Sequence, residues 1–306
     1  MPRTGMPMLD PESRVTGFKE VELGFTEEQA KREALRCVDC SVCSECKACE
    51  RTCNAGAISH RQQDEILEIP VSAVIMANGF DTSSELPDGY GYGRYRNVVT
   101  SLEYERILSA SGPYAGHVQK PSDGKAPERI AFIQCAGSRD SKCSSEYCSA
   151  VCCMYAVKEA MITREHLPTV KDIDIFYMDI RAYGKDFDKY IDNAKSKYGI
   201  GFIRSRVSDV SEDSGTGMLM LKYTDENGII QNGAYDMVVL SVGLEPKGSV
   251  QPLLEKAGVK TDKYGFCWVG EMSAPETSRK GISACGVTSG PKDIPETSLF
   301  DRKLFA

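Results

Sequence analysis

The stretch RIAFIQCAGSRD, residues 129–140, opens the main folding unit of the chain and predicts a strand and the turn that follows it. Its apolar run has the length of a buried strand, and a Gly-containing turn comes directly afterwards. Downstream, the pattern predicts a helix through YCSAVCCMYAVKEA (147–160), a strand over 172–180, a helix over 185–199 and another strand over 199–210. This alternation favours an α/β fold whose parallel strands are joined by crossover helices.

Segments on either side extend this outline. Thr26 is placed to cap a helix, SLEYERILSASGP (101–113) reads as a short helix stopped by Gly-Pro, and VSAVIMA (71–77) has the β-branched content of a buried strand. Residues 218–243 predict a hairpin with an Asn-Gly turn and a final buried strand.

The composition excludes several classes of function. The 306 residues are 41% hydrophobic, and the net charge of -7 comes without a basic stripe, so a nucleic-acid surface has no support. No apolar run reaches the roughly 18 residues of a membrane span. The start MPRTGMPMLDPESR lacks the apolar core of a signal peptide, and we therefore expect a cytoplasmic protein.

Thirteen cysteines are the unusual feature of the composition. An odd count without an export signal argues against a disulfide scaffold, and metal binding is the better explanation in a reducing compartment. Cys43, Cys46, Cys49 and Cys53 follow the spacing C-x2-C-x2-C-x3-C, by which ferredoxin loops hold iron-sulfur clusters. Zinc also accepts four thiolates, but zinc ribbons usually pair two C-x2-C knuckles across a longer loop.

This cluster segment departs from the ferredoxin pattern in two ways. Asn54 stands where proline usually follows the last cysteine, and Cys37 and Cys40 extend the run at the same interval. Cys37 and Cys40 either bind a second cluster together with ligands from elsewhere or remain unligated.

A second group of thiols comes from the central segment. On the predicted helix Cys148 and Cys152 lie four residues apart and share one face, with Cys153 about 100° further round. Cys135 ends the preceding strand and could face the same spot. The alternative is that these cysteines are small buried hydrophobic residues, which is common for free thiols.

These residues carry a resemblance to a known family. FIQCAGSRD, YCSAVCCMYAVKEA, MDIRAYGKDF, YGYGRYRNVVTSLEYERILSASGP and GPKDIP together resemble the A-type flavin subunit of heterodisulfide reductases and its bacterial relatives, over most of residues 35–300. The approach GF-x-EVE-x-GFTEEQA to the first cysteines also resembles the small subunit of glutamate synthase. The resemblance implies an iron-sulfur flavoprotein with a thioredoxin-reductase-like fold, and some members of the family bifurcate electrons at FAD.

The resemblance also implies roles for single residues. Cys135, Cys148, Cys152 and Cys153 would ligate a [4Fe-4S] cluster near the flavin, giving two [4Fe-4S] clusters in all with the N-terminal one. Lys158 would reach the flavin N5 region, with Glu105 in the same neighbourhood, and a cation there would stabilise reduced, anionic flavin. On the residues alone, both are ordinary exposed charges.

Two further segments match flavin-domain pieces of the family. SAVIMANGF places Gly79 after a strand, and GISACGVTSGPKDI carries Gly286 and Asp293, which would contact FAD. A Gly-rich G-x-G-x-x-G turn, on which FAD pyrophosphate lies in this fold, is absent from the sequence. Either a partner chain supplies the FAD-binding Rossmann lobe, or flavin binding has been lost; the first is favoured because Gly286 and Asp293 would otherwise lack a purpose.

The sequence therefore predicts an oxidoreductase subunit that transfers electrons between FAD and clusters and on to the other redox subunits of a complex. The alternatives are a flavin-free iron-sulfur adaptor and a zinc-stapled structural subunit. The sequence predicts five segments: an N-terminal arm and helix (1–36), an iron-sulfur segment (37–60), a partial FAD-domain segment (61–128), an NAD(P)-domain-like unit with the second cluster (129–248) and a C-terminal FAD-domain segment (249–306).

Overall fold

The chain forms two compact units, Met1–Glu65 and Ile66–Ala306. The computed structural model describes residues 4–17, 19–35, 47–141, 145–270 and 275–302. The helices of the first unit are α1 (Pro11–Arg14), α2 (Glu27–Ala34) and α3 (Ala48–Thr52). Thr26 caps α2 as predicted, because its hydroxyl accepts a hydrogen bond from the Gln29 amide while the Gln29 side chain accepts one from the Thr26 amide.

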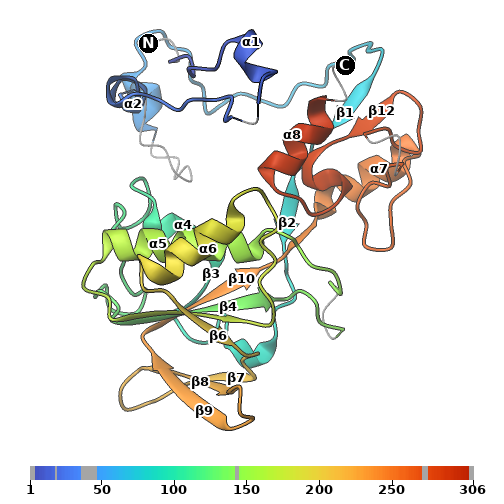
Figure 1. The fold of residues 1–306 in the computed structure, drawn as a ribbon. Coiled ribbons are helices and arrows are strands. Elements are labelled where there is room, and N and C mark those ends of the chain that lie inside the picture. Colours follow the sequence, from blue (N-terminus) through green and yellow to red (C-terminus); the bar gives the residue numbers. More distant parts are fainter. Residues whose placement is uncertain (1–3, 18, 36–46, 142–144, 271–274, 303–306) are drawn as a thin grey trace. The chain divides into compact units, whose positions relative to one another are not determined.

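The second unit is built around a five-stranded sheet (Figure 1). Its strands, in spatial order, are β3 (Val98–Thr100), β10 (Met237–Val242), β4 (Arg129–Ala136), β5 (Asp172–Tyr177) and β6 (Gly201–Arg204). All four pairings are parallel, which confirms the predicted α/β class. β10 is buried along its whole length, as a central strand covered on both faces requires.

Both faces of this sheet are covered. The helices α4 (Ser101–Leu108), α5 (Cys152–His166) and α6 (Phe187–Ser196) lie over one face and bury an apolar layer against it (Figure 1). The opposite face packs on a small antiparallel sheet of β7 (Asp209–Glu212), β8 (Leu219–Thr224) and β9 (Ile230–Tyr235). The Asn-Gly turn predicted for the hairpin joins β8 to β9.

The remaining segments form a smaller part with its own core, which includes Met76, Leu254 and Cys267. An antiparallel pair of β2 (Phe80–Thr82) and β11 (Leu244–Pro246) connects it to the large sheet. Its elements are β1 (Val74–Met76), which pairs in parallel with β12 (Ile282–Ala284), and the helices α7 (Gln251–Ala257) and α8 (Ile294–Arg302). Short 3-10 turns are η1 (Asp88–Tyr90), η2 (Gly248–Val250) and η3 (Gly286–Ser289).

Two predicted strands differ from the structure. The strand expected over 71–77 is only β1, and Val74 and Ile75 stay 39% and 47% exposed because β12 is its sole described neighbour. The strand expected over 199–210 is interrupted after β6. The chain leaves the large sheet there because Val207 and Val210 pack on its opposite face, where β7 joins β8.

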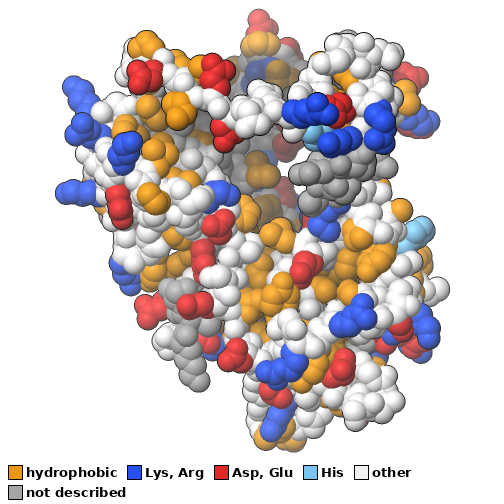
Figure 2. All heavy atoms as spheres, turned by 180° about the vertical axis from the view of Figure 1, so that it is seen from behind, with side chains coloured by type: hydrophobic (Ala, Val, Ile, Leu, Met, Phe, Trp, Pro, Cys, Tyr) orange, Lys and Arg blue, Asp and Glu red, His pale blue; other side chains and the backbone are white. Residues whose placement is uncertain are grey.

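On the face drawn in Figure 2, side chains of both charges, Lys and Arg as well as Asp and Glu, reach the surface. None of the helices within the described ranges is long and apolar enough to traverse a lipid bilayer.

Candidate functional site

Cys135 occupies a β-bulge near the end of β4. Ile133 pairs with Leu240 and Ala136 with Val242, so two residues of β4 oppose the single Ser241 of β10. The backbone of Cys135 is left-handed (φ 58°), a conformation that residues other than glycine rarely adopt. The bulge breaks the in-and-out alternation of the strand and turns the thiol toward the loop that follows.

Cys148 does not lie on a helix, contrary to the prediction. Helix α5 begins only at Cys152, and Cys148 belongs to the loop before it. Ala150 has a left-handed backbone (φ 62°), which interrupts any helix that would start earlier. Ser149 holds the loop in place, because its hydroxyl accepts a hydrogen bond from the Leu244 amide at 2.8 Å.

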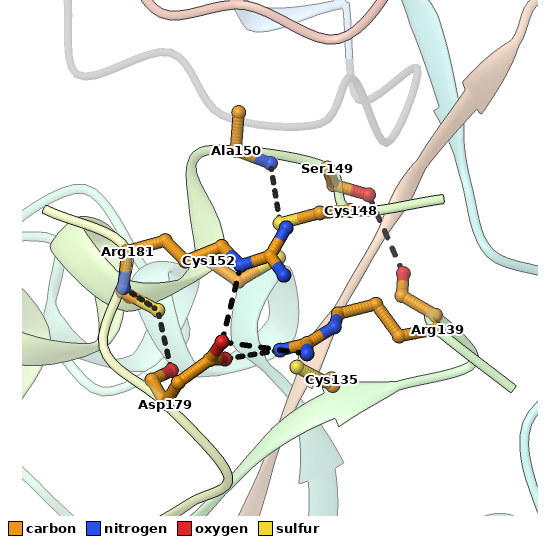
Figure 3. Close-up of a pocket in the computed structure, with 10 residues that line it drawn as sticks. Cys135, Arg139, Cys148, Ser149, Ala150, Cys152, Asp179 and Arg181 are labelled. Carbon is orange, nitrogen blue, oxygen red and sulfur yellow. Dashed lines mark hydrogen bonds and ion pairs between the residues drawn. The ribbon is translucent and has the colours of Figure 1, made fainter. Parts of the chain in front are cut away.

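The four predicted thiols nevertheless converge. Cys135, Cys148, Cys152 and Cys153 line one small cavity of about 10 Å³, together with Arg139, Asp179 and Arg181 (Figure 3). They come from the end of β4, the loop and the first turn of α5. Among the described residues, no three His, Cys, Asp or Glu side chains are arranged around a single metal ion. A [4Fe-4S] cluster differs from a single ion because each thiolate binds a separate iron.

The thiols receive backbone hydrogen bonds. The Ala150 amide donates to Cys148 Sγ and the Arg181 amide to Cys153 Sγ, both at 3.4 Å. In the absence of metal Cys152 and Cys153 are protonated, because burial raises the pKa of Cys153 to about 11 and raises the pKa of Cys152 still further. A soft metal would replace these protons on binding.

Two arginines, Arg139 and Arg181, line the thiol cavity together with Asp179, and the sequence pattern gave little sign of them. Burial raises the pKa of Cys135, and the Arg139 guanidinium, which is hydrogen-bonded to the thiol, acts in the opposite direction. Arg139 forms an ion pair with Asp179, which also binds Arg181 at 3.4 Å. Partial burial of Asp179 raises the pKa of its carboxyl group, but the two arginines outweigh this effect and lower the pKa overall. Two guanidinium groups thus face a site that would carry negative thiolate charge.

A much larger cavity lies next to the thiols. Its volume is about 680 Å³, within the range of small-molecule sites, and its lining is mainly apolar. Ala150 lines both cavities. Two further residues of the larger cavity adjoin Cys152 of the thiol cavity: Val151 precedes it in the chain, and the Val242 carbonyl oxygen lies 3.5 Å from Cys152 Sγ. A single layer of residues therefore separates the two cavities.

Lys158 and Glu105, both predicted from the resemblance, line this larger cavity. They form an ion pair of 3.0 Å between α5 and α4, and their side chains are 48% and 46% exposed. The structure brings them together although 53 residues separate them in sequence. The Lys158 ammonium group therefore presents a positive charge at this wall of the cavity.

Glu159 is a residue of the cavity that sequence reasoning missed. Its side chain also lines the cavity, yet the residue is only 2% exposed and its Oε2 has no hydrogen-bond partner among the described residues. Burial raises the pKa of Glu159 to about 9, an effect that Glu105 reinforces and Lys158 opposes. The available signal was a glutamate on a helix whose neighbouring positions are almost all apolar.

The three predicted flavin-contact residues occupy different places. Asp293 lines the larger cavity and also caps α8, where its carboxylate accepts a hydrogen bond from the Glu296 amide at 2.8 Å. Gly286 adopts φ 58°, and its carbonyl accepts a hydrogen bond from Lys292, another lining residue. Gly79 lies apart from them, on a small separate cavity of about 10 Å³.

Most of the N-terminal cysteine segment lies outside the described residues, including Cys37, Cys40, Cys43 and Cys46. Cys49 and Cys53 lie on α3 and at its end. The Ala57 amide donates to Cys53 Sγ at 3.4 Å, and Cys49 Sγ lies 3.6 Å from His60 Nε2. The cluster predicted for this segment stays a prediction.

A family model matches part of the second unit. Residues 147–297 match the family model described as pyridine nucleotide-disulphide oxidoreductase. Among solved structures, thioredoxin reductase of T. acidophilum is 18% identical with a TM-score of 0.47, over 76% of this chain and 62% of that chain. The family match and the parallel sheet agree with the predicted thioredoxin-reductase-like α/β class.

The most informative relatives are components of one kind of enzyme. An A-type iron-sulfur subunit of the CoB–CoM heterodisulfide reductase of Methanopyrus kandleri is 44% identical over 248 residues, 80% of this chain and 38% of the relative. The A-type subunit of the H2:CoB–CoM heterodisulfide, ferredoxin reductase of Methanothermobacter marburgensis is 40% identical over 263 residues, 85% of this chain and 39% of the relative. The chain therefore belongs to the family of A-type heterodisulfide reductase subunits, as its motifs indicated. It spans about two fifths of the length of these relatives.

Proposed function

We propose that this chain is a redox subunit of a heterodisulfide-reductase-like complex, and that it transfers electrons between FAD and [4Fe-4S] clusters and on to partner subunits. The observation that carries the proposal is the shared wall between the thiol cavity and the larger cavity. A cluster on Cys135, Cys148, Cys152 and Cys153 and a flavin in the larger cavity would be separated by one layer of residues.

The donor set of the thiol cavity fits an iron-sulfur cluster in its chemistry. Four thiols meet two amide donors and two guanidinium groups, which is how proteins hold and tune a negatively charged cluster. The free space of about 10 Å³ holds roughly one water molecule, so the thiols must move outward to admit four iron atoms. The loop that carries Cys148 can move outward more readily than Cys152 and Cys153, because these two cysteines are part of α5.

The larger cavity fits an aromatic cofactor of the size of an isoalloxazine ring. It is mostly apolar and carries a few polar groups, including Lys158, Glu105 and Asp293. Flavin supplies reversible uptake of one or two electrons when it is bound. Lys158 would then stabilise the negative charge that reduction places on the ring, and the apolar residues would exclude water around it.

The pyrophosphate end of FAD requires residues that this sequence lacks. No G-x-G-x-x-G turn occurs in the 306 residues, so we propose that this turn comes from outside them. A partner chain with a FAD-binding Rossmann lobe is the source that the sequence predicts. Electron bifurcation at the flavin, which the resemblance implies, also stays a prediction.

The experiment is an anaerobic purification of the native protein, followed by counts of iron, acid-labile sulfide and FAD per chain. We expect about eight irons, in two four-iron clusters, and FAD together with co-purifying redox subunits. Iron without FAD, even with those subunits present, would support the flavin-free adaptor instead. Zinc, or no metal, would overturn the assignment of both cysteine groups.

A further inference from the structure

The wall of the larger cavity contains a group that the proposed electron transfer does not use. Glu159 follows Lys158 on α5 and points into the packing between α5 and α4, where it is hydrogen-bonded to Glu105. We propose that Glu159 stores one proton for the cavity and passes it through Glu105 to the bound flavin when the flavin takes up electrons. This inference rests on the proposed function, since it takes FAD as the ligand.

The surroundings of Glu159 favour a stored proton. A buried carboxylate without a full set of hydrogen bonds is unfavourable, and Glu159 Oε2 has no partner among the described residues. Protonation removes the charge and turns one oxygen into a donor for the neighbouring carboxylate. Burial, the largest cause, raises the pKa of Glu159 to about 9, so the residue is a neutral acid at pH 7.

No other described titratable group around Glu159 can supply the stored proton near neutral pH. Lys158 is its charged neighbour on α5 and is paired with Glu105 of α4. Tyr104 of α4 and Tyr155 of α5 also feel the charge of Glu159, but burial raises the pKa of both phenols far above neutral pH. Both tyrosines keep their protons throughout the physiological range.

Glu105 provides the path for the proton. It lines the cavity, is hydrogen-bonded to Glu159 and is about half exposed. Its Oε1 accepts a hydrogen bond from the Lys158 ammonium group at 3.0 Å, and carboxylate oxygens can accept a proton. Glu105 therefore connects the stored proton both to the cavity and to solvent.

Electrons and protons balance in the proposed step. Two electrons leave reduced iron-sulfur clusters and enter the flavin, whose ring nitrogen takes up one proton. The O–H bond of Glu159 breaks and an O–H bond forms on Glu105; that bond then breaks as the new N–H bond forms on the flavin. Glu159 is left as a carboxylate, and solvent restores its proton through Glu105.

The first test needs no flavin. Infrared spectra of the isolated chain should contain the carbonyl stretching band of a neutral carboxylic acid at pH 7, and the band should titrate away near pH 9. The band should be absent from Glu159→Gln. It should remain in Glu165→Gln, a matched control on the exposed face of the same helix.

The second test uses the complex with FAD bound and follows flavin reduction by stopped flow from pH 6 to pH 8. The wild-type rate should stay constant, because the proton is already stored. In Glu159→Gln the rate should fall about tenfold per pH unit, because the proton must come from solvent. Glu159→Asp should restore the constant rate, and Glu165→Gln should match the wild type.

The outcomes separate this inference from the proposed function. Failure of FAD to bind, visible in the absorption spectrum before any variant is made, overturns the proposed function and this inference with it. If FAD binds but the wild-type band is missing at pH 7, only the inference is overturned. If the band is present but flavin reduction in Glu159→Gln keeps the pH profile of the wild type, again only the inference is overturned.

Discussion

Among the single residues of the thiol cavity, Cys135 depends most on its backbone, because a bulge and a left-handed conformation aim its side chain. We expect Cys135→Ser, purified anaerobically, to contain about four fewer irons per chain than the wild type. Serine keeps the shape but removes the soft thiolate that iron requires. Cys267→Ser is the control, since Cys267 is buried in the separate core of the smaller part. An unchanged iron count in Cys135→Ser would contradict the ligand assignment.

Lys158 is the residue through which the cavity would act on a flavin electrostatically. We expect Lys158→Met to lower the midpoint potential of bound FAD, because reduced flavin loses a nearby positive charge. Each 1.4 kcal/mol of lost stabilisation corresponds to about 30 mV in a two-electron couple. Spectroelectrochemical titration measures the shift, and Lys256→Met, at the end of α7, should leave the potential unchanged. A potential that stays constant in Lys158→Met would place the flavin elsewhere.

Glu159 should also make stability depend on pH. Its raised pKa means that, between its ordinary value of 4.5 and about 9, the native state keeps a proton that the unfolded chain releases. Stability relative to Glu159→Gln should therefore fall as pH rises through this window, by about 1.4 kcal/mol per pH unit. Urea unfolding of both proteins from pH 5 to pH 8 tests this. Parallel pH profiles for the two would show that Glu159 is ionised in the folded chain.

Among the structural elements, the junction of β10 and β11 determines how the cysteine-bearing loops fit together. A Cβ atom on Gly243 would come within 2.1 Å of Ser138 Oγ and 2.7 Å of Ser149 Oγ. We expect Gly243→Ala to lower the free energy of unfolding by about 1–3 kcal/mol and to reduce iron occupancy. Gly215→Ala is the control, because its Cβ would meet only one side-chain atom at an ordinary 3.5 Å. Thermal melts and iron counts that match in the two variants would contradict this packing role.

Helix α5 contributes residues to both the thiol cavity and the larger cavity. It presents Cys152 and Cys153 at its first turn, Lys158 and Glu159 toward the larger cavity, and Ala156 to the core. One helix thus lines both cavities, so a shift of α5 would change the thiol site and the cavity wall together. This coupling is the structural reason why both sites should respond to the same substitutions in α5.

For the molecule as a whole, the division into two units makes a separate prediction. The second unit, Ile66–Ala306, contains the four converging cysteines and the larger cavity. We expect a chain of residues 66–306 to fold and to bind about four irons, against about eight for the full chain. Circular dichroism and iron analysis measure this. A shortened chain that stays unfolded, or that binds no iron, would show that the second unit depends on the first.

Several features of this protein follow from the sequence alone. The apolar runs around Phe132 and Ile175 predicted strands of a parallel sheet, the capping pattern at Thr26 predicted the start of α2, and Asn227-Gly228 predicted the hairpin turn. Each of these depends on interactions between residues that are close in the chain, so local patterns suffice. The family resemblance carried by the cysteine motifs was confirmed by the relatives that the chain matches.

Only the tertiary structure decided how these pieces meet. Sequence spacing placed Cys148 on a helix, whereas a left-handed Ala150 places it in a loop, and a bulge directs Cys135 toward it. Glu159 and Glu105 are brought together only because α5 packs on α4. Periodicity reports which face of an element is apolar, but convergence of distant segments depends on bulges, loop conformations and helix packing, which no local pattern specifies.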